Sequence, residues 1–541
     1  MYLILKITKY SLIILLWVIF SNFKVKAQSE LYKKDFEASP YAKFINKQQL
    51  LKNLSVLTAD SLEGRETGTI GAEKASRFIA KNFKDFGLKA IVNKPELGTS
   101  SKSYFFPIPL KQWVSQNGTL QIGNLTLQSG KDFIPVSRDG FLGQEILQDS
   151  LLIGIQKPSD TSMDFGLKGE KVEGKILFLT FLTPDSGNIS FKKNTDVYNY
   201  FRKLRLELKK ISAKKPRAIF LNTVDIQMLS ENEFYKGIRT SPQMGFDPKG
   251  AVKPLGIFLI QTDAFNKILA GNNLNIQTIS SSTFYSISLQ KVNLEIPLLV
   301  SDVSASDVIG FMEGTDLKEE VLILSAHYDH LGKHNGQIYH GADDDGSGSA
   351  ALVNLALAFS KAKKAGHGPR RSILFLANVG EEKGLLGSYY YSEHPVIPIK
   401  NTIADLNIDM IGRVDEAHIK DSAYVYVIGS GKLSSDLQFI SEGINKQFSH
   451  LNLDYTYDSP SDPNQFYYRS DHYNFARLGV PIIFYFNGVH ADYHQPSDTI
   501  EKINFGIYAK RAQLVFFTAW DLANRENKPK VDRKSDFSTR N

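Results

Sequence analysis

The sequence predicts an α/β fold with a mixed, mostly parallel central sheet flanked by helices and an inserted smaller β-rich α/β domain. After about residue 290, apolar runs of buried-strand length alternate with segments of helical length, which is typical of a sheet covered by helices. From about residue 100 to 288, short strand-like runs are separated by turn residues. The length of 541 residues also exceeds what one hydrophobic core normally serves, so at least two domains are expected.

The chain before the insertion is predicted to be helical. Residues 40–98 are assigned to the N-terminal part of the main domain. Within them, IGAEKASRFIAKNFKDFGL places Ala75, Ile79 and Phe83 on one apolar stripe, and Gly87 is a natural stop. The segment therefore predicts an amphipathic helix that packs against the sheet.

The inserted domain is assigned to residues 100–288. GKILFLTF and PRAIFLN are its clearest strand candidates. The basic run RKLRLELKKISAKKPR has Leu204, Leu208 and Ile211 at helical spacing, so we interpret it as a helix with a solvated charged face.

The third segment, residues 289–525, carries the predicted central sheet. Its buried-strand candidates lie at 321–326, 372–379, 402–411, 423–429 and 480–486. Its helix candidates lie at 347–363, 385–394, 433–448, 471–478 and 506–525. The polar stretch 526–541 is expected to fray.

Composition narrows the class of protein. The chain is 42% hydrophobic and 22% charged with a net charge of +7, and it has no arginine-rich arm, so a folded protein without a nucleic-acid partner is predicted. The absence of cysteine excludes disulfides and thiolate metal sites. Residues 1–27 have the layout of a secretory signal peptide, and a retained anchor is the alternative. The signal-peptide layout predicts export to a periplasmic or extracellular location, and no later segment reaches spanning length.

Acids and histidines lie near the carboxyl ends of the predicted strands. HYDH begins at His327 after one strand, GADDDGSG precedes a helix, and GEE follows the next strand. Asp409 lies at the end of a third strand, and His494 follows a fourth. Ligands in α/β sheets gather at the carboxyl ends of strands, so these five sites are expected to converge on one edge.

These residue types favour a divalent cation. Two imidazoles with carboxylates and no sulfur suit zinc or a similar ion. Two ions about 3.5 to 4 Å apart need a shared ligand, and a carboxylate can bridge them. We therefore expect one of the three aspartates in GADDDGSG to bridge two cations, whose charge offsets the crowding.

The ordered motifs HYDHLG, GADDDGSGSAA, GEEKGLLGS, NIDMIGR and YHQPSDT resemble the di-zinc aminopeptidase and glutamate carboxypeptidase superfamily. The resemblance covers residues 290–525, makes 289–525 the catalytic domain, and implies an inserted protease-associated domain. It also implies that the chain is a zinc-dependent metallopeptidase with two Zn²⁺ ions, most simply an aminopeptidase acting on peptide or protein N-termini.

Carried onto this sequence, the resemblance assigns individual roles. Asp344 becomes the bridging ligand. The remaining metal ligands are His327 and Asp409 for one ion, and Glu382 and His494 for the other. The three catalytic residues are Glu381 as general base, Asp329 as the group that orients an imidazole, and Tyr493 as a donor to the oxyanion.

Nearby residues receive other expectations. His330, His334 and His340 are expected in the loop or at the substrate rim. Asp343 and Asp345 are expected outside the metal shell, and Asp471 and His472 are expected to be structural or outer partners.

Other functions stay open at this point. Glutaminyl cyclases share the fold but use one zinc. A glutamate carboxypeptidase-like enzyme would need basic groups to bind the terminal carboxylate of its substrate. A transferrin-receptor-like binding protein would lack some of the metal ligands. Arg413 and Arg469 are the candidates for binding a substrate carboxylate, although a structural role is the simpler interpretation of both. Oligomeric state is not indicated.

Overall fold

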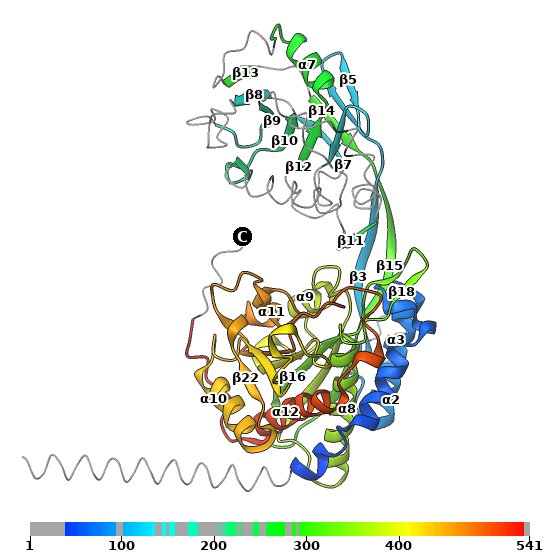
Figure 1. Ribbon diagram of the computed structural model, residues 1–541, viewed down its shortest axis with the longest axis vertical. Helices are drawn as coiled ribbons and strands as arrows, with labels where there is room; N and C mark the ends of the chain where they lie inside the picture. The colour runs from blue at the N-terminus through cyan, green and yellow to red at the C-terminus, as the bar shows by residue number, and fades with distance from the viewer. Residues whose placement is uncertain are drawn as a thin grey trace, which may run out of the picture. The chain divides into compact units, whose positions relative to one another are not determined.

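The computed structural model describes most of the chain after the predicted signal peptide. The described residues are 38–93, 101–135, 143–147, 151–156, 171–181, 204, 208, 211–222, 226, 229, 242–247, 256–275, 284–287 and 292–534. The predicted signal peptide and the end of the polar tail lie outside them. The chain divides into two compact units, one formed by Met1–Ile108 with Ser304–Asn541 and the other by Pro109–Val303 (Figure 1).

A large mixed sheet forms the centre of the first unit, with strand order β3-β15-β19-β16-β20-β23-β21-β22. The bounds are β3 Phe105–Ser115, β15 Leu298–Met312, β16 Leu317–His327, β19 Arg371–Asn378, β20 Thr402–Ile408, β21 Tyr424–Ile428, β22 Asn452–Asp454 and β23 Ile482–Phe486. Neighbours β19, β16, β20 and β23 run parallel, whereas β15 and β21 pair antiparallel with β19 and β23. The predicted mixed, mostly parallel sheet is confirmed.

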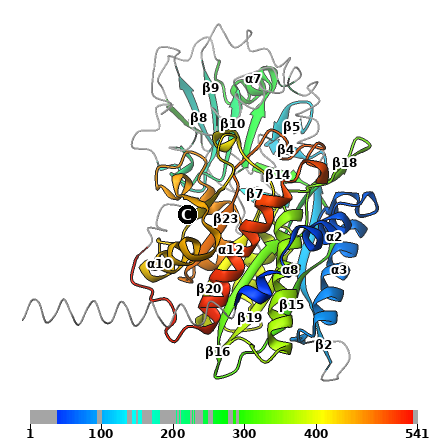
Figure 2. The same ribbon diagram turned by 60° about the horizontal axis from the view of Figure 1, so that its bottom comes forward.

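Helices cover this sheet. The bounds are α2 Lys47–Leu57, α3 Ile70–Phe86, α8 Gly346–Lys364, α9 Leu386–Glu393, α10 Ser435–Ile444, α11 His472–Ala476 and α12 Phe505–Asn524. Helix α8 contacts α2, α3 and α12 and lies against β16, β19 and β20. Helices α9 and α11 contact each other, and α11 contacts β20 and β23. Figures 1 and 2 show the sheet between these two groups of helices.

Helix α3 illustrates how sequence produces this packing. Thr69 caps its N-terminus by accepting a hydrogen bond from the Ala72 amide, and Gly87 ends it with a φ of 87°. Phe83 on its apolar stripe is fully buried. A Cβ atom at Gly310 of β15 would lie 2.7 Å from the Phe83 ring, so the helix can approach this strand only because residue 310 is glycine.

The second unit contains two sheets. The six-stranded sheet has the order β13-β8-β9-β10-β12-β6, and the four-stranded sheet has the order β5-β4-β14-β7. Strand bounds are β4 Thr119–Ile122, β5 Leu125–Gln128, β6 Phe133–Pro135, β7 Gly143–Leu147, β8 Leu151–Gln156, β9 Ile176–Phe181, β10 Ala218–Asn222, β12 Gly256–Ile260, β13 Phe284–Ile287 and β14 Val292–Ile296, and α7 spans Thr262–Ala270. Inner side chains of both sheets and of α7 share one hydrophobic core. The short strand β11, Gln243–Gly245, pairs with the part of β3 that belongs to this unit.

The sequence patterns of the second unit match its described residues. Both predicted strands, GKILFLTF and PRAIFLN, contribute to parallel pairs, as β9 and β10. Leu204, Leu208 and Ile211 are helical and buried, in keeping with the predicted stripe.

The centre of the first unit buries a carboxyl group whose effect on stability depends on pH. Asp405 on β20 is fully buried, and its Oδ1 accepts a hydrogen bond of 2.7 Å from Ser325. Burial raises the pKa of Asp405 to about 8. The folded protein therefore holds a proton here that the unfolded chain releases near pH 4, and stability should fall as pH rises from about 4 to about 8.

We predict that the stability of Asp405→Asn does not fall as pH rises from about 4 to about 8, because asparagine has the shape of the neutral acid but carries no titrating proton. The melting temperature of the variant relative to that of the wild type should be higher at pH 9 than at pH 5 in thermal unfolding experiments. The exposed Asp421 provides the matched control, Asp421→Asn. A difference that does not change with pH would show that Asp405 is not the titrating group.

Candidate metal centre

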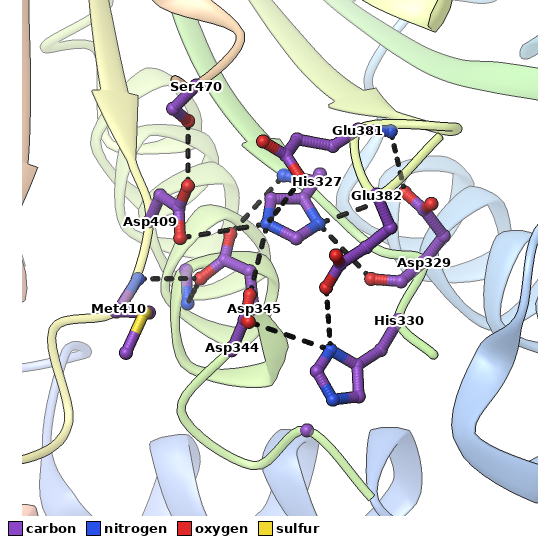
Figure 3. A network of polar contacts seen from close by, with 12 residues as sticks. His327, Asp329, His330, Asp344, Asp345, Glu381, Glu382, Asp409, Met410 and Ser470 are labelled. Atoms are coloured by element: carbon purple, nitrogen blue, oxygen red, sulfur yellow. Dashed lines mark hydrogen bonds and ion pairs between the residues drawn. The ribbon is translucent and has the colours of Figure 1, made fainter. Parts of the chain in front are cut away.

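The candidate site lies at the carboxyl ends of four parallel strands of the first unit. His327 is the last residue of β16, and Asp344 lies in the turn that leads into α8. Glu381 follows β19, Asp409 follows β20, and His494 lies in the loop after β23. Figure 3 shows the side chains from the first three of these strands and from the turn pointing toward one another. The predicted convergence of the motifs is thus what the structure shows.

One set of side chains surrounds His327. Its Nε2 lies 3.4 Å from Asp344 Oδ1, 3.6 Å from Asp409 Oδ1 and 3.9 Å from Glu381 Oε2. Its Nδ1 lies 3.1 Å from the backbone oxygen of Asp329 and 3.8 Å from the carboxylate of that residue. His327, Glu381 and Asp409 form one group whose ligand atoms lie within 4.8 Å of one another.

A second set adjoins the first and shares Asp344 with it. His330 Nδ1 lies 2.9 Å from Glu382 Oε1 and 3.8 Å from Asp344 Oδ2. His494 Nε2 lies 3.1 Å from Asp344 Oδ2 and 3.3 Å from Glu382 Oε2. His330, Asp344 and Glu382 form the second group with ligand atoms within 4.8 Å of one another. Asp344 thus directs one oxygen toward each set.

The three consecutive aspartates have separate partners. Asp343 accepts a hydrogen bond of 2.7 Å from the Gly412 amide. Asp345 caps α8 by accepting from the Gly348 amide at 2.8 Å, and the same oxygen accepts from the Met410 amide at 3.0 Å. Only the middle aspartate, Asp344, faces both sets. Hydrogen bonds from backbone amides stabilise the negative charge of its two neighbours.

The polar atoms of the site fit cations. His327 Nε2 and Asp344 Oδ2 are buried and make no hydrogen bond among the described residues. Burial raises the pKa of Glu381 well above its ordinary value, with Glu382 and Asp409 adding to the shift. Burial alone would lower the pKa of His327, but Glu381 and Asp409 raise it well above its ordinary value. The cluster thus holds more acid than its imidazoles neutralise, and nitrogen and oxygen donors of this kind are those that zinc prefers.

Residues of the N-terminal segment support the site from behind. Arg65 is fully buried and donates to the backbone oxygens of Tyr328 and Gly341, at 2.8 Å and 2.9 Å. Thr67 donates to Asp329 at 2.6 Å, and Glu66 pairs with Lys383 at 2.8 Å. Each of these residues therefore holds a loop that carries a candidate ligand.

A polar chain leads from Asp409 into the sheet. Ser470 donates to Asp409 Oδ2 at 2.7 Å and accepts from Asn407 at 2.9 Å. Asn407 in turn accepts from Ser325, which also donates to Asp405. Asp409 is thus oriented by partners that are themselves fixed, as ligating carboxylates usually are.

A pocket opens over the site. It is lined by Asp344, Glu381, Asp409, Met410, Phe466, Arg469, Phe484, Phe486, Val489, Tyr493 and His494. The ring of Tyr493 stacks on that of His494 with centroids 3.8 Å apart. Arg469 lies over the Phe466 ring, whereas Arg413 is paired with Asp492 at 2.7 Å.

The structure brings together every residue that the sequence nominated as a ligand, and it places a further histidine beside them. His330, expected in the loop or at the rim, is instead fully buried within the second set. His334 and His340 stay outside, bonded to the Leu331 backbone oxygen and to Asp60. No local sequence pattern separates His330 from the other histidines of this loop, because its ring packs against Gly341, which lies in the next loop.

Partners that support the ligands were also missed. Arg65, Thr67 and Ser470 are remote in sequence from the side chains that they hold, so no local pattern indicates them. Asp471 and His472 are fully buried, and His472 bonds to the Tyr467 backbone oxygen at 2.9 Å.

Together, the fold and the site define an α/β protein with two adjoining sets of candidate metal-ligating side chains. Residues 307–519 match the model of peptidase family M28. The matched residues include all of the candidate ligands described above.

Individual relatives are similar to this chain over less than half of its length. A probable leucine aminopeptidase of Arthroderma benhamiae is 32% identical over 212 residues, which are 38% of this chain and 55% of the relative. Aminopeptidase YwaD of Bacillus subtilis is 24% identical over 284 residues, which are 49% of this chain and 56% of the relative. The chain thus spans about half the length of these relatives. An aminopeptidase from Aneurinibacillus sp. strain AM-1 aligns with a TM-score of 0.49 at 18% identity, over 93% of this chain and 98% of that chain.

Proposed function

We propose that the protein is a zinc-dependent exopeptidase, an aminopeptidase that hydrolyses the N-terminal peptide bond of peptides or proteins. One observation carries the proposal: Asp344 directs its two oxygens into two adjoining sets of histidines and carboxylates. The match to peptidase family M28 over these residues and the aminopeptidase relatives support it.

The site would hold two zinc ions. His327 and Asp409 would hold one ion, Glu382 and His494 would hold the other, and Asp344 would contribute one oxygen to each. When bound, zinc supplies Lewis-acid polarisation of the substrate carbonyl and acidifies water. The buried, hydrogen-bond-free Nε2 of His327 and Oδ2 of Asp344 support this assignment.

Glu381 acts as the general base. Its carboxylate is only 12% exposed and lies beside the first set, while its backbone amide donates to Asp329 at 3.3 Å. It accepts a proton from the attacking water and returns it to the leaving amine. Tyr493, which lines the same pocket, donates to the oxygen on which negative charge develops.

The pocket favours an apolar residue at the substrate N-terminus. Its walls carry Met410, Phe466, Phe484, Phe486 and Val489 beside the candidate ligands. Apolar surface of this kind gains from removing an aliphatic or aromatic side chain from water. Leucine-type and phenylalanine-type substrates should therefore be cleaved faster than charged ones.

A substrate panel with and without metal tests this function. We predict that aminoacyl anilides with apolar residues are hydrolysed and that N-blocked versions are not, because a free N-terminus is required. A chelator should abolish the activity, and Zn²⁺ should restore it at a stoichiometry of two ions per chain. A stoichiometry of one with cyclisation of N-terminal glutamine would instead identify a glutaminyl cyclase-like enzyme.

A carboxypeptidase-like enzyme is the second candidate. Arg469 is exposed at the pocket and lies 4.8 Å over the Phe466 ring, and no ion pair holds it among the described residues. An arginine in that position suits a substrate carboxylate. Release of the C-terminal residue from an N-blocked peptide would favour this candidate over the aminopeptidase.

We further propose that the chain is exported by residues 1–27 and that the second unit is a protease-associated domain. The signal-peptide layout and the strand runs of residues 100–288 support these two assignments. In the part of the chain that the structure describes, no helix is both long and apolar enough to span a membrane.

A further inference from the structure

We propose that His330 is a further metal ligand, so that the second set holds its zinc ion with four protein donors while the first set keeps an open coordination position. This inference rests on the proposed function, because it concerns the same pair of ions. It adds a ligand that neither the sequence motifs nor the family resemblance assigned.

The position of His330 is tightly determined. The side chain is fully buried, and its backbone amide donates to the Arg65 oxygen at 3.2 Å. A Cβ atom at Gly341 would lie 2.4 Å from the His330 ring, so the ring packs directly against the backbone of the aspartate loop. No other residue type at position 341 would leave room for this ring orientation.

The donor atoms of the second set are spaced as zinc requires. Ligands on a tetrahedron with zinc bonds of about 2.0 to 2.2 Å lie about 3.3 to 3.6 Å apart. The measured separations are 2.9 Å and 3.8 Å from His330 Nδ1 to the oxygens of Glu382 and Asp344. From His494 Nε2 to the same two residues they are 3.3 Å and 3.1 Å. His330 faces Oε1 of Glu382 and His494 faces Oε2, and both imidazoles border Oδ2 of Asp344 (Figure 3 shows all of these residues except His494).

The second ring nitrogen of His330 also has a suitable environment. Nε2 is buried without a hydrogen-bond partner among the described residues, and the buried carboxylate of Asp498 lies near enough to be affected by a charge on the ring without forming an ion pair with it. Metal-ligating histidines commonly direct their other N–H toward a carboxylate. Asp498 Oδ1 is itself without a hydrogen-bond partner in the described part of the chain.

The two ions would consequently differ in function. A zinc ion with four protein donors resembles a structural site, whereas one with three protein donors keeps a position for water or substrate. His327, Asp344 and Asp409 provide three donors to the first ion. The second set would then hold its ion more tightly than the first set holds its own.

Counting imidazole ligands tests the inference without relying on activity. The purified full-length protein, loaded with Zn²⁺, is compared with His330→Gln by X-ray absorption, by zinc content and by zinc affinity in competition with a chelating dye. We expect three imidazoles over two ions in the wild type and two in the variant. We also expect the tighter zinc affinity to fall by at least about 100-fold, more than the loss of an outer-sphere partner causes.

His334→Gln is the matched control, because His334 lies in the same loop but is exposed and bonds to a backbone oxygen. It should keep both zinc ions and all three imidazoles. His330→Asn and circular dichroism of the metal-free proteins separate loss of a ligand from loss of the fold. An unchanged imidazole count in folded His330→Gln would overturn the inference and leave the proposed function intact. A wild type that binds fewer than two zinc ions would contradict both.

Discussion

Glu381→Gln is expected to lower kcat for an apolar aminoacyl anilide by about 10²- to 10⁴-fold while zinc content stays at the wild-type level. Glutamine has the shape of glutamate but cannot accept a proton. The Glu381 side chain is only 12% exposed, so bulk solvent is a poor substitute for it. KM should change little, because the substitution removes a proton transfer rather than a binding contact.

Zinc content decides between two roles for this carboxylate. Glu381 Oε2 lies 3.9 Å from His327 Nε2, close enough for Glu381 to belong to a ligand group as well. Loss of one zinc ion from Glu381→Gln would assign it as a ligand and contradict its role as the base. Glu393→Gln is the control. Glu393 is the last residue of α9, and its half-exposed carboxylate is paired with Arg477. It should leave both kcat and zinc content unchanged.

The central sheet was predictable because its strands are buried on both faces. Runs such as VLILSA and SILFLANV leave few alternatives to a buried strand, and both became parallel neighbours, β16 and β19. The candidate ligands were predictable for the same reason. His327, Glu382 and Asp409 lie at or just after the ends of such strands, so the sheet fixes their common edge before any side-chain detail is known.

Side-chain orientation within a loop was not predictable. The chain has four histidines between residues 327 and 340, and no periodicity operates there to separate buried rings from exposed ones. His330 is turned inward by Gly341, which approaches from the next loop, and not by its neighbours in sequence. The boundaries of the second unit were not predictable from the sequence either. They lie at Pro109 and Val303, inside the long strands β3 and β15, where the sequence pattern does not change.

Arg65 provides the second large effect, and it shows how much of the site depends on residues far away in the sequence. Its guanidinium donates to four backbone oxygens, those of Leu57, Tyr328, His340 and Gly341. The last three belong to the two loops that carry His327, His330 and Asp344. Burial lowers the pKa of Arg65, with Asp345 and Asp344 acting in the opposite direction, so the positive charge also faces the acids of the site.

We predict that Arg65→Lys lowers the free energy of unfolding by at least about 3 kcal/mol, because lysine lacks the planar fork and leaves buried carbonyl groups without donors. Zinc affinity should fall by about 10- to 100-fold, since both ligand-bearing loops lose a common support. Chemical denaturation of the metal-free protein measures the first effect, and zinc competition titration measures the second. Arg77→Lys, on the exposed face of α3, should change neither. Loss of stability without loss of zinc affinity would show that Arg65 supports the fold but does not position the metal centre.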